Sequence, residues 1–153
     1  MLRRQLLLES ISALLILLFL YASMSKFLDF RTFYHDLNNQ PFPHSWTPFL
    51  VWFIPLTEIA LSLMLIFERT RLSGFYGSLV LMGLFTIYAI AILLNFFAYV
   101  PCSCGGVIKH LTWPQHLVLN LFFLGLSLSG ALIQRKKPFK QPFITAPTKQ
   151  SLV

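Results

Sequence analysis

Residues 73–99 decide the fold of this chain, and they read SGFYGSLVLMGLFTIYAIAILLNFFAY. The stretch contains no acidic or basic side chain, and it exceeds the roughly 20 apolar residues that a helix needs to cross a bilayer. Inside lipid the backbone amides have no water to bond, so a crossing segment must satisfy them internally. The sequence therefore predicts a transmembrane helix, which is tilted or projects past the lipid because of its length.

Three further apolar stretches, at about 6–25, 49–67 and 115–133, are also long enough to cross a bilayer. Glu9 and Glu58 are the charged side chains within them. Apolar residues make up 56% of the 153 residues and charged residues 11%, against roughly 45–50% and about 25% in soluble domains. The chain has too few polar residues to cover a globule in water. We predict an all-α integral membrane protein, built as a bundle of four transmembrane helices.

This bundle is expected to form one domain over residues 1–133. The connection at 68–72 is so short that the helices on either side of it must be antiparallel neighbours. Small residues at the start of the following helix allow close helix approach: Ser73, Gly74, Gly77 and Ser78. Residues 134–153 form a basic, proline-containing tail that we expect to be cytoplasmic and poorly ordered.

Basic residues are distributed unevenly over the ends of the predicted helices. One side of the membrane holds nine of the twelve: Arg3, Arg4, Arg69, Arg71, Arg135, Lys136, Lys137, Lys140 and Lys149. The other side holds Lys26, Arg31 and Lys109. Cytoplasmic loops carry an excess of lysine and arginine, so both termini are predicted to be cytoplasmic. Residues 26–48 and 100–114 then lie outside, in the periplasm of a bacterial inner membrane. The net charge of +7 reflects this orientation and contact with anionic lipid, not nucleic-acid binding.

Residues 1–25 also have the pattern of a secretory signal peptide, with Arg3 and Arg4 before an apolar stretch and small residues near its end. The apolar stretch is longer than the roughly 7–15 residues usual in signal peptides, so we interpret it as the first membrane span. Cleavage would leave the orientation of the remaining spans unchanged.

A short amphipathic helix is predicted over residues 26–37, because Phe27, Phe30, Tyr34 and Leu37 recur at helical spacing. The prolines that follow, in the segment PFP at 41–43, end it. Trp46 and Trp52 suit the headgroup level at the start of the second span. Residues 112–115, TWPQ, match a capping box with proline in the first turn, which predicts the start of the fourth span.

Residues 101–106 read PCSCGG and contain both cysteines of the chain, Cys102 and Cys104. Cysteines at this spacing close a disulfide only in a turn, where their Cα atoms come within roughly 4.4–6.8 Å, and the flanking proline and glycines favour a turn. Disulfides persist outside the cytoplasm, and strained or exposed ones are labile and oxidising. The pair is therefore a redox pair, a structural bridge that braces the loop, or two simple thiols.

Metal binding is a further alternative for this region. His110 and His116 follow the cysteines and could complete a set of two thiolates and two imidazoles, which zinc or Cu(I) accepts. The spacing matches no zinc-finger pattern, and we assign no metal ligands.

Glu58 requires an explanation because it lies near the middle of the second span. A charged side chain at that depth costs roughly 2.5–3.5 kcal/mol on insertion scales, so it should face the bundle interior or be protonated. Lys26, at the outer end of the first span, is the nearest plausible cation by depth. The two residues form a structural ion pair, or Glu58 is a proton relay or the polar contact of a bound quinone.

Other polar residues lie at a similar depth in the third and fourth spans. Tyr88 and Asn95 share one face with Tyr99, and His116 and Asn120 are one helical turn apart. Interhelical hydrogen bonds explain such residues. The alternative is that Tyr88, Asn95 and Asn120 line a pocket with Glu58 that opens toward the cysteines.

Four of these motifs together resemble the DoxX-like superfamily, and most closely its branch named for the methylamine-utilisation protein MauE. They are SKFLD at 25–29 with Phe33, PLTE at 55–58, PCSCGG at 101–106 and WPQHLVLN at 113–120. The resemblance covers residues 10–133. One departure is that many members read Cys-Gly-Cys-Phe-Gly, where this chain has Ser103 and Gly105.

The resemblance implies a four-helix inner-membrane protein. It also implies a role in maturing a disulfide-rich periplasmic dehydrogenase beside a thioredoxin-like partner, which would assign thiol exchange to Cys102 and Cys104. The leading hypothesis is accordingly a thiol–disulfide redox helper. Its attacking sulfur must be a thiolate, which His110 or Lys109 would favour. Electrons pass to or from a periplasmic thioredoxin-like protein, with a quinone near Glu58 as the candidate cofactor.

Two rival functions come from other classes. The first is a non-catalytic accessory subunit of a membrane complex, with partner subunits packed on its apolar faces and a cysteine bridge that only braces a loop. The second is a small-solute carrier, for which the sequence lacks the broken-helix repeat that marks a midplane site. Under the leading hypothesis the site residues are Cys102, Cys104, Glu58, Lys26, His110 and His116, with Tyr88, Asn95 and Asn120 in the pocket.

Overall fold

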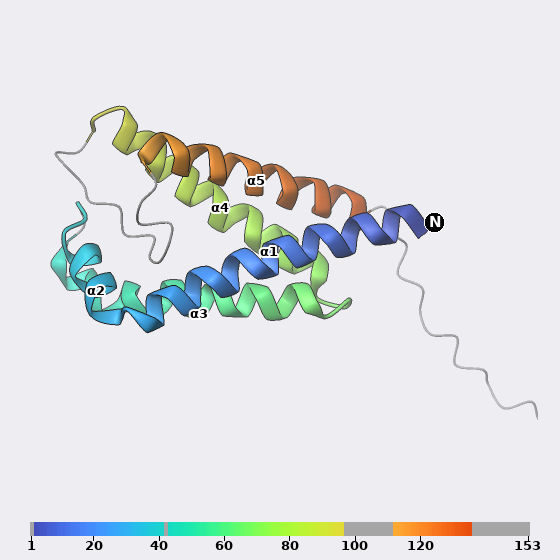
Figure 1. Ribbon diagram of the computed structural model, residues 1–153, viewed down its shortest axis with the longest axis horizontal. Helices are drawn as coiled ribbons and strands as arrows, with labels where there is room; N and C mark the ends of the chain where they lie inside the picture. The colour runs from blue at the N-terminus through green and yellow to red at the C-terminus, as the bar shows by residue number, and fades with distance from the viewer. Residues whose placement is uncertain (1, 42, 97–111, 136–153) are drawn as a thin grey trace, which may run out of the picture.

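The computed structural model of the protein describes residues 2–41, 43–96 and 112–135 (Figure 1). These residues form helices and no strand. The elements are α1 (Leu2–Leu28), α2 (Phe30–Asn38), the 3-10 turn η1 (His44–Trp46), α3 (Thr47–Ile66), α4 (Arg71–Leu93) and α5 (Trp113–Arg135).

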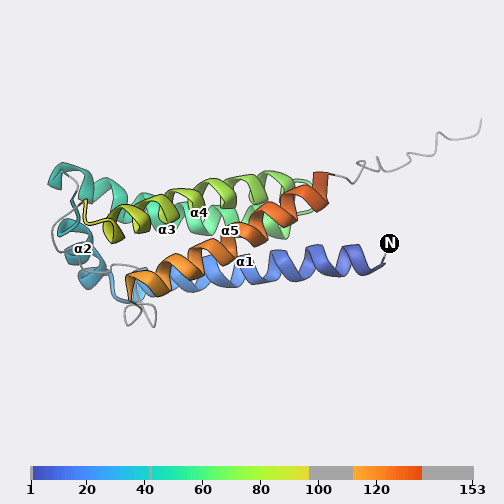
Figure 2. The ribbon, with the colours of Figure 1, turned by 90° about the horizontal axis from the view of Figure 1, so that it is seen from above.

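The four long helices form an up-and-down bundle. Around it the order is α1, α3, α4 and α5, with α5 packed back against α1, and the two perpendicular views agree on this arrangement (Figures 1 and 2). The short α2 packs on α3 at one end of the bundle. We call this the α2 end; it holds the last turns of α1 and α4 and the first turns of α3 and α5 (Figure 1).

All four long helices have the length and composition to cross a membrane. Their outward faces carry large apolar side chains, for example Leu17, Val80 and Val118, each more than 60% exposed. A soluble monomer rarely exposes contiguous apolar surface on this scale, whereas lipid is the natural solvent for it. The predicted all-α membrane bundle of four helices is confirmed.

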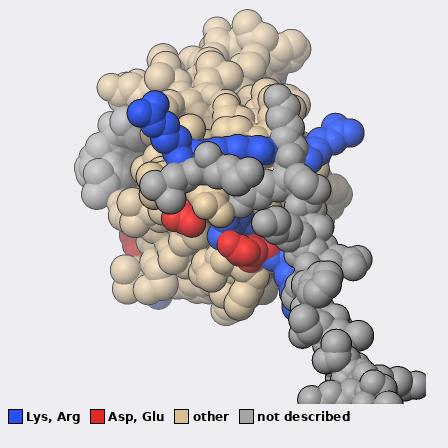
Figure 3. Space-filling view, turned by 90° about the vertical axis from the view of Figure 1, so that its right-hand side faces the viewer, with Lys and Arg blue, Asp and Glu red and all other residues tan. Residues whose placement is uncertain are grey.

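The opposite end of the bundle, which we call the arginine end, carries Arg3, Arg4, Arg69, Arg71 and Arg135. Figure 3 looks onto this end and shows basic side chains on it, with a few acidic side chains beside them. Two of the arginines bond helix carbonyls: Arg4 donates to Ile133 O, and Arg71 Nε donates to Leu65 O at 3.2 Å. Such bonds satisfy carbonyls that lack helical partners at helix C-termini.

The third span is shorter than its apolar sequence predicts, because α4 ends at Leu93 and not near 99. Asn95 takes a left-handed conformation with φ 57°. Its N–H bonds Ile92 O at 3.0 Å, and Phe96 N–H bonds Ala91 O at 3.1 Å. This pair of bonds is a Schellman motif, in which a glycine or asparagine in the left-handed region ends a helix.

Replacing Asn95 by valine should therefore lower the free energy of unfolding by about 1–2 kcal/mol, because a β-branched residue tolerates positive φ poorly. Asn95→Gly is the matched control and should leave stability unchanged or slightly raised. The measurement is unfolding in mixed micelles of increasing denaturing-detergent content, followed by circular dichroism. Equal losses in the two variants would contradict the cap.

The predicted amphipathic helix forms as α2. Its buried residues are Phe33 and Leu37, which pack with Val51 of α3. Phe30 packs against the same cluster, but Tyr34 is 40% exposed, so the apolar face is rotated from the one that the sequence spacing predicts. The rotation follows from the break at Asp29 (φ −124°, ψ 54°), which separates α2 from α1.

The start of α5 follows the predicted capping box. The N–H of Thr112 donates to Gln115 Oε1 at 2.9 Å, and His116 N–H bonds Thr112 O at 3.0 Å. Pro114 lies in the first turn, where its missing N–H costs no helical bond. The cap fixes the rotation of the first turns of α5, and so the direction in which His116 points.

Close helix contacts hold the arginine-end half of the bundle together. The predicted small residues Gly74 and Gly77 of α4 face α3: a Cβ on Gly77 would lie 2.4 Å from Leu61 Cδ2, and one on Gly74 3.1 Å from the side chain of Leu65. On the other side of α4, Gly130 of α5 lies against the fully buried ring of Phe75. Small residues at these points allow the helices to approach closely.

Candidate functional site

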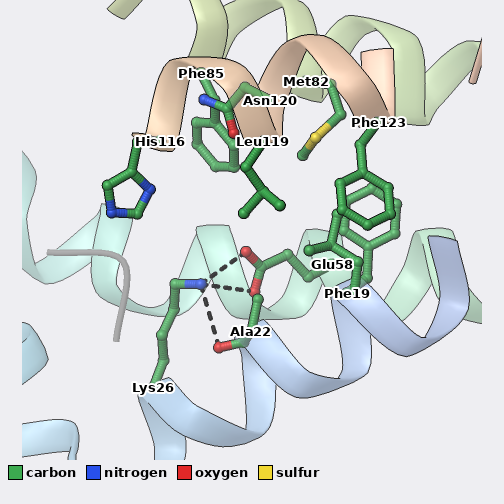
Figure 4. A pocket seen from close by; sticks show the side chains of 11 residues that line it. Phe19, Ala22, Lys26, Glu58, Met82, Phe85, His116, Leu119, Asn120 and Phe123 are labelled. Carbon is green, nitrogen blue, oxygen red and sulfur yellow. Dashed lines mark hydrogen bonds and ion pairs between the residues drawn. The ribbon is translucent and has the colours of Figure 1, made fainter. Parts of the chain in front are cut away.

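Lys26 of α1 and Glu58 of α3 form a buried ion pair between their helices (Figure 4). Lys26 Nζ donates to Glu58 Oε1 at 2.8 Å and to Oε2 at 3.1 Å. The two residues are 5% and 1% exposed. The structural ion pair predicted from depth is therefore present. A buried charge is costly unless it is paired and hydrogen-bonded, and each residue here neutralises the other.

Helix periodicity brings both charges into the bundle interior. On α1, Leu15, Phe19 and Lys26 lie on one buried face; on α3, Glu58 shares its buried face with Leu65. The 3.6-residue period places side chains seven or eight residues apart on the same side of a helix. The sequence thus dictates that both charged groups face inward with the core residues.

Two further groups hold the ammonium of Lys26. It donates to Ala22 O, one turn earlier in α1, at 3.2 Å. It also lies 5.8 Å from the centre of the Phe33 ring of α2, within cation–π range. The α2 helix therefore contributes directly to the site, by covering the cation with an aromatic face.

A small cavity of about 50 Å³ lies beside the ion pair and is lined by residues of all four long helices. Lys26 and Glu58 form one polar wall, and His116 and Asn120 of α5 form the other (Figure 4). The remaining lining residues are apolar: Leu18, Phe19, Ala22, Met82, Phe85, Leu119 and Phe123. The site therefore gathers four polar side chains within an apolar shell.

His116 is 2% exposed. The centroid of its ring lies 6.0 Å from the centroid of the Trp113 ring. The Trp113 ring in turn contacts the ring of Tyr88 edge-on, with 6.3 Å between centroids. The hydroxyl of Tyr88 donates to Gln40 Oε1. Gln40 in turn donates to Asp36 O at 3.0 Å. This chain of contacts ties α2, α4 and α5 together at the α2 end, above the cavity.

The structure brings some of the predicted site residues together and separates others. Lys26, Glu58, His116 and Asn120 line one cavity. Tyr88 and Asn95 do not line it: Tyr88 belongs to the contacts with Gln40 and Trp113, and Asn95 lies beyond the end of α4 as its cap. Cys102, Cys104 and His110 lie outside the described residues. Within the described ranges, no three His, Cys, Asp or Glu side chains gather as metal ligands.

Sequence reasoning did not place two residues at this site, although Phe33 belongs to the motif at 25–33 that carries the family resemblance. Phe33 lies in the predicted amphipathic helix, but the register of α2, and hence its position over Lys26, depends on the break at Asp29. Gln40 is 5% exposed although it lies between Asn39 and Pro41 in a turn, where neither periodicity nor hydropathy indicates burial. A buried glutamine in a loop has no signal of its own in a single sequence.

The cavity has the size and chemistry of a water site. A buried water molecule needs a cavity volume of roughly 10–15 Å³ and two to four polar partners, and four polar side chains are present here. Pockets for larger ligands are usually about 300–1,000 Å³. A quinone ring near Glu58 would therefore require its aromatic neighbours to move.

Comparison with known proteins gives a match to one family model, which covers almost the whole bundle. The family model described as methylamine utilisation protein MauE matches residues 4–133. No curated protein and no solved structure matches the chain. The matched range begins in α1, ends in α5 and includes the Lys26–Glu58 pair, the cavity and both cysteines. On this match the chain belongs to the MauE family of methylamine utilisation proteins.

Proposed function

We propose that this protein is a membrane-embedded thiol–disulfide exchange helper that matures proteins outside the cytoplasm. The observation that carries the proposal is the position of Cys102 and Cys104, the only cysteines in the chain. They lie within the range matched by the family, in the connection from α4 to α5. The described residues on either side of that connection, Phe96 and Thr112, both lie at the α2 end. The family's description names methylamine utilisation as the pathway served.

The distribution of arginines supports placing these cysteines outside. Arg3, Arg4, Arg69, Arg71 and Arg135 lie at the arginine end, whereas Lys26, held in the ion pair, and Arg31 lie at the α2 end. An excess of basic residues marks the cytoplasmic side. The α2 end then faces the periplasm of a bacterial inner membrane, a compartment in which disulfides persist.

The exchange step balances between the substrate thiols and the cysteine disulfide, and a second disulfide is needed to restore the pair. A thiolate of a substrate protein attacks one sulfur of the Cys102–Cys104 disulfide and forms a mixed disulfide. A second substrate thiolate breaks that bond, so the substrate gains a disulfide and the two cysteines become thiols. Two electrons and the two thiol protons of the substrate pass to the cysteine pair. A thioredoxin-like protein in its disulfide form then reoxidises the pair by the same steps in reverse.

Trapping of mixed disulfides tests the proposal. In cells quenched with acid and alkylated, Cys102→Ser or Cys104→Ser should accumulate a covalent adduct with a second protein. The mixed disulfide formed by the remaining cysteine persists because the neighbouring thiol that would break it is absent. The wild type and the double Cys→Ser variant are the controls and should show no adduct. Reduction should release the partner for identification.

The rival function, an accessory subunit with a structural bridge, gives a different result. The pair would stay oxidised in every growth state, neither single variant would capture a partner, and the double variant would support methylamine-dependent growth. An impermeant thiol reagent provides a second test. Labelling of reduced Cys102 and Cys104 in intact spheroplasts agrees with the proposal, and labelling only after membrane disruption contradicts it.

A further inference from the structure

Within the ion pair, Lys26 uses all of its hydrogen-bond donors, whereas Glu58 uses only some of its acceptor positions. A lysine ammonium has three donors, and those of Lys26 are directed at both oxygens of Glu58 and at Ala22 O. An ionised carboxylate has about four acceptor positions, and Lys26 occupies two of them. Because Glu58 is 1% exposed, any further donor to its remaining acceptor positions would have to come from inside the protein.

The cavity beside Glu58 can supply that donor in the form of water. Its volume of about 50 Å³ exceeds the roughly 10–15 Å³ that a buried water molecule needs. His116 and Asn120, two residues with polar side chains, line the cavity opposite the ion pair (Figure 4). A water molecule there would meet the number of polar partners that buried waters have.

We propose that this cavity binds water and that the water links Glu58 to His116, so that Glu58 exchanges protons with the solution at the α2 end. His116 lies in the first turns of α5, and its backbone N–H bonds the carbonyl of Thr112, where the helix begins. An imidazole can accept a proton on one nitrogen and release one from the other. The path runs from the carboxylate through water to the imidazole of His116, which lies in the first turns of α5 at the α2 end.

The surroundings of Lys26 allow Glu58 to take up a proton without expelling the lysine. When the carboxylate is neutral, the ammonium keeps its bond to Ala22 O and its position at the Phe33 ring. Among the described residues that line the cavity, the titratable ones are Lys26, Glu58 and His116; α4 contributes Met82 and Phe85, and Phe33 of α2 lies over Lys26. This proton site goes beyond the proposed thiol exchange and requires neither cysteine.

Infrared difference spectroscopy on the full-length protein in lipid nanodiscs tests the site. Acidification in steps should produce a carbonyl stretch of a protonated carboxyl group, which shifts in D₂O and is absent in Glu58→Gln. In His116→Gln the hydrogen–deuterium exchange of this band should slow by roughly 100-fold, the contribution of a positioned acid–base group. His35→Gln is the matched control, since the His35 side chain is 75% exposed on α2, and it should exchange like the wild type.

Several outcomes would overturn the inference. The first is the absence of a Glu58 band while circular dichroism shows a folded bundle. The second is a band whose frequency does not shift in D₂O. The third is an equal exchange rate in His116→Gln and the wild type. If Glu58→Gln fails to fold, Glu58→Asp identifies the band by a shift in its frequency. The titration is repeated in the double Cys→Ser variant, where it should be unchanged; failure of the thiol proposal therefore leaves this result separate.

Discussion

Replacing Lys26 by methionine should lower the free energy of unfolding of the bundle by about 3–5 kcal/mol, the usual cost of breaking a buried ion pair on one side. The substitution keeps much of the volume of the side chain and removes its charge. Glu58, 1% exposed, would then lack the two hydrogen bonds that Lys26 donates. The penalty comes from the carboxylate left behind, since an unpaired buried charge is far more costly than a buried methionine.

Two further variants separate this cause from a loss of packing. Lys26→Met with Glu58→Met should recover most of the stability, because replacing both partners of a buried pair by apolar residues is often close to neutral. Arg31→Met removes an exposed cation at the same end of the bundle and should change stability by less than about 1 kcal/mol. Detergent unfolding followed by circular dichroism measures all three. A double variant as unstable as Lys26→Met would contradict the explanation.

Replacing Gly130 by leucine should be nearly as damaging, with an expected loss of about 3 kcal/mol, at the upper end of the range for overpacking. A Cβ at this position would lie 2.4 Å from Cε1 of Phe75. Phe75 is fully buried in the core cluster and packs among residues of several helices, so its ring has little room to move away. The helices α4 and α5 would have to separate along their contact.

Gly125 is the matched control for this prediction. It lies in the same helix, is exposed, and a Cβ there would meet nothing within 4 Å. Gly125→Leu should therefore keep or raise stability, because leucine has a higher helix propensity than glycine. Combining Gly130→Ala with Phe75→Leu should cost less than the sum of the single changes, since contacting residues are non-additive. Equal effects of leucine at positions 125 and 130 would show that the Phe75 contact is unimportant.

Much of the fold follows from local sequence patterns. Four apolar stretches of membrane-spanning length predict four helices, and the short connection around Glu68 makes two of them antiparallel neighbours. The capping pattern at 112–115 locates the start of α5 to within a residue or two. The end of α4 was harder to predict, because the apolar run continues past Asn95 and hydropathy does not report the sign of φ.

The sequence likewise predicts one part of the candidate site and not the rest. The cost of a carboxylate in lipid indicates that Glu58 faces inward, and depth indicates Lys26 as its partner; the structure shows both. The grouping of Tyr88 and Asn95 with Asn120 relied on spacing along single helices. In the bundle, Asn120 lines the cavity while Tyr88 bonds Gln40. Spacing along one helix gives a face, but not the neighbour that this face meets.

The sequence by itself determined the class of the protein, its four helices and the pairing of Lys26 with Glu58. These depend on interactions local to one helix, or on the large penalty for an unpaired charge in lipid. Only the tertiary structure decided that His116 and Asn120 line a cavity beside Glu58, and that Phe33 covers Lys26. Both facts depend on the rotation and register of packed helices, which arise from many weak contacts between side chains that are distant in the sequence.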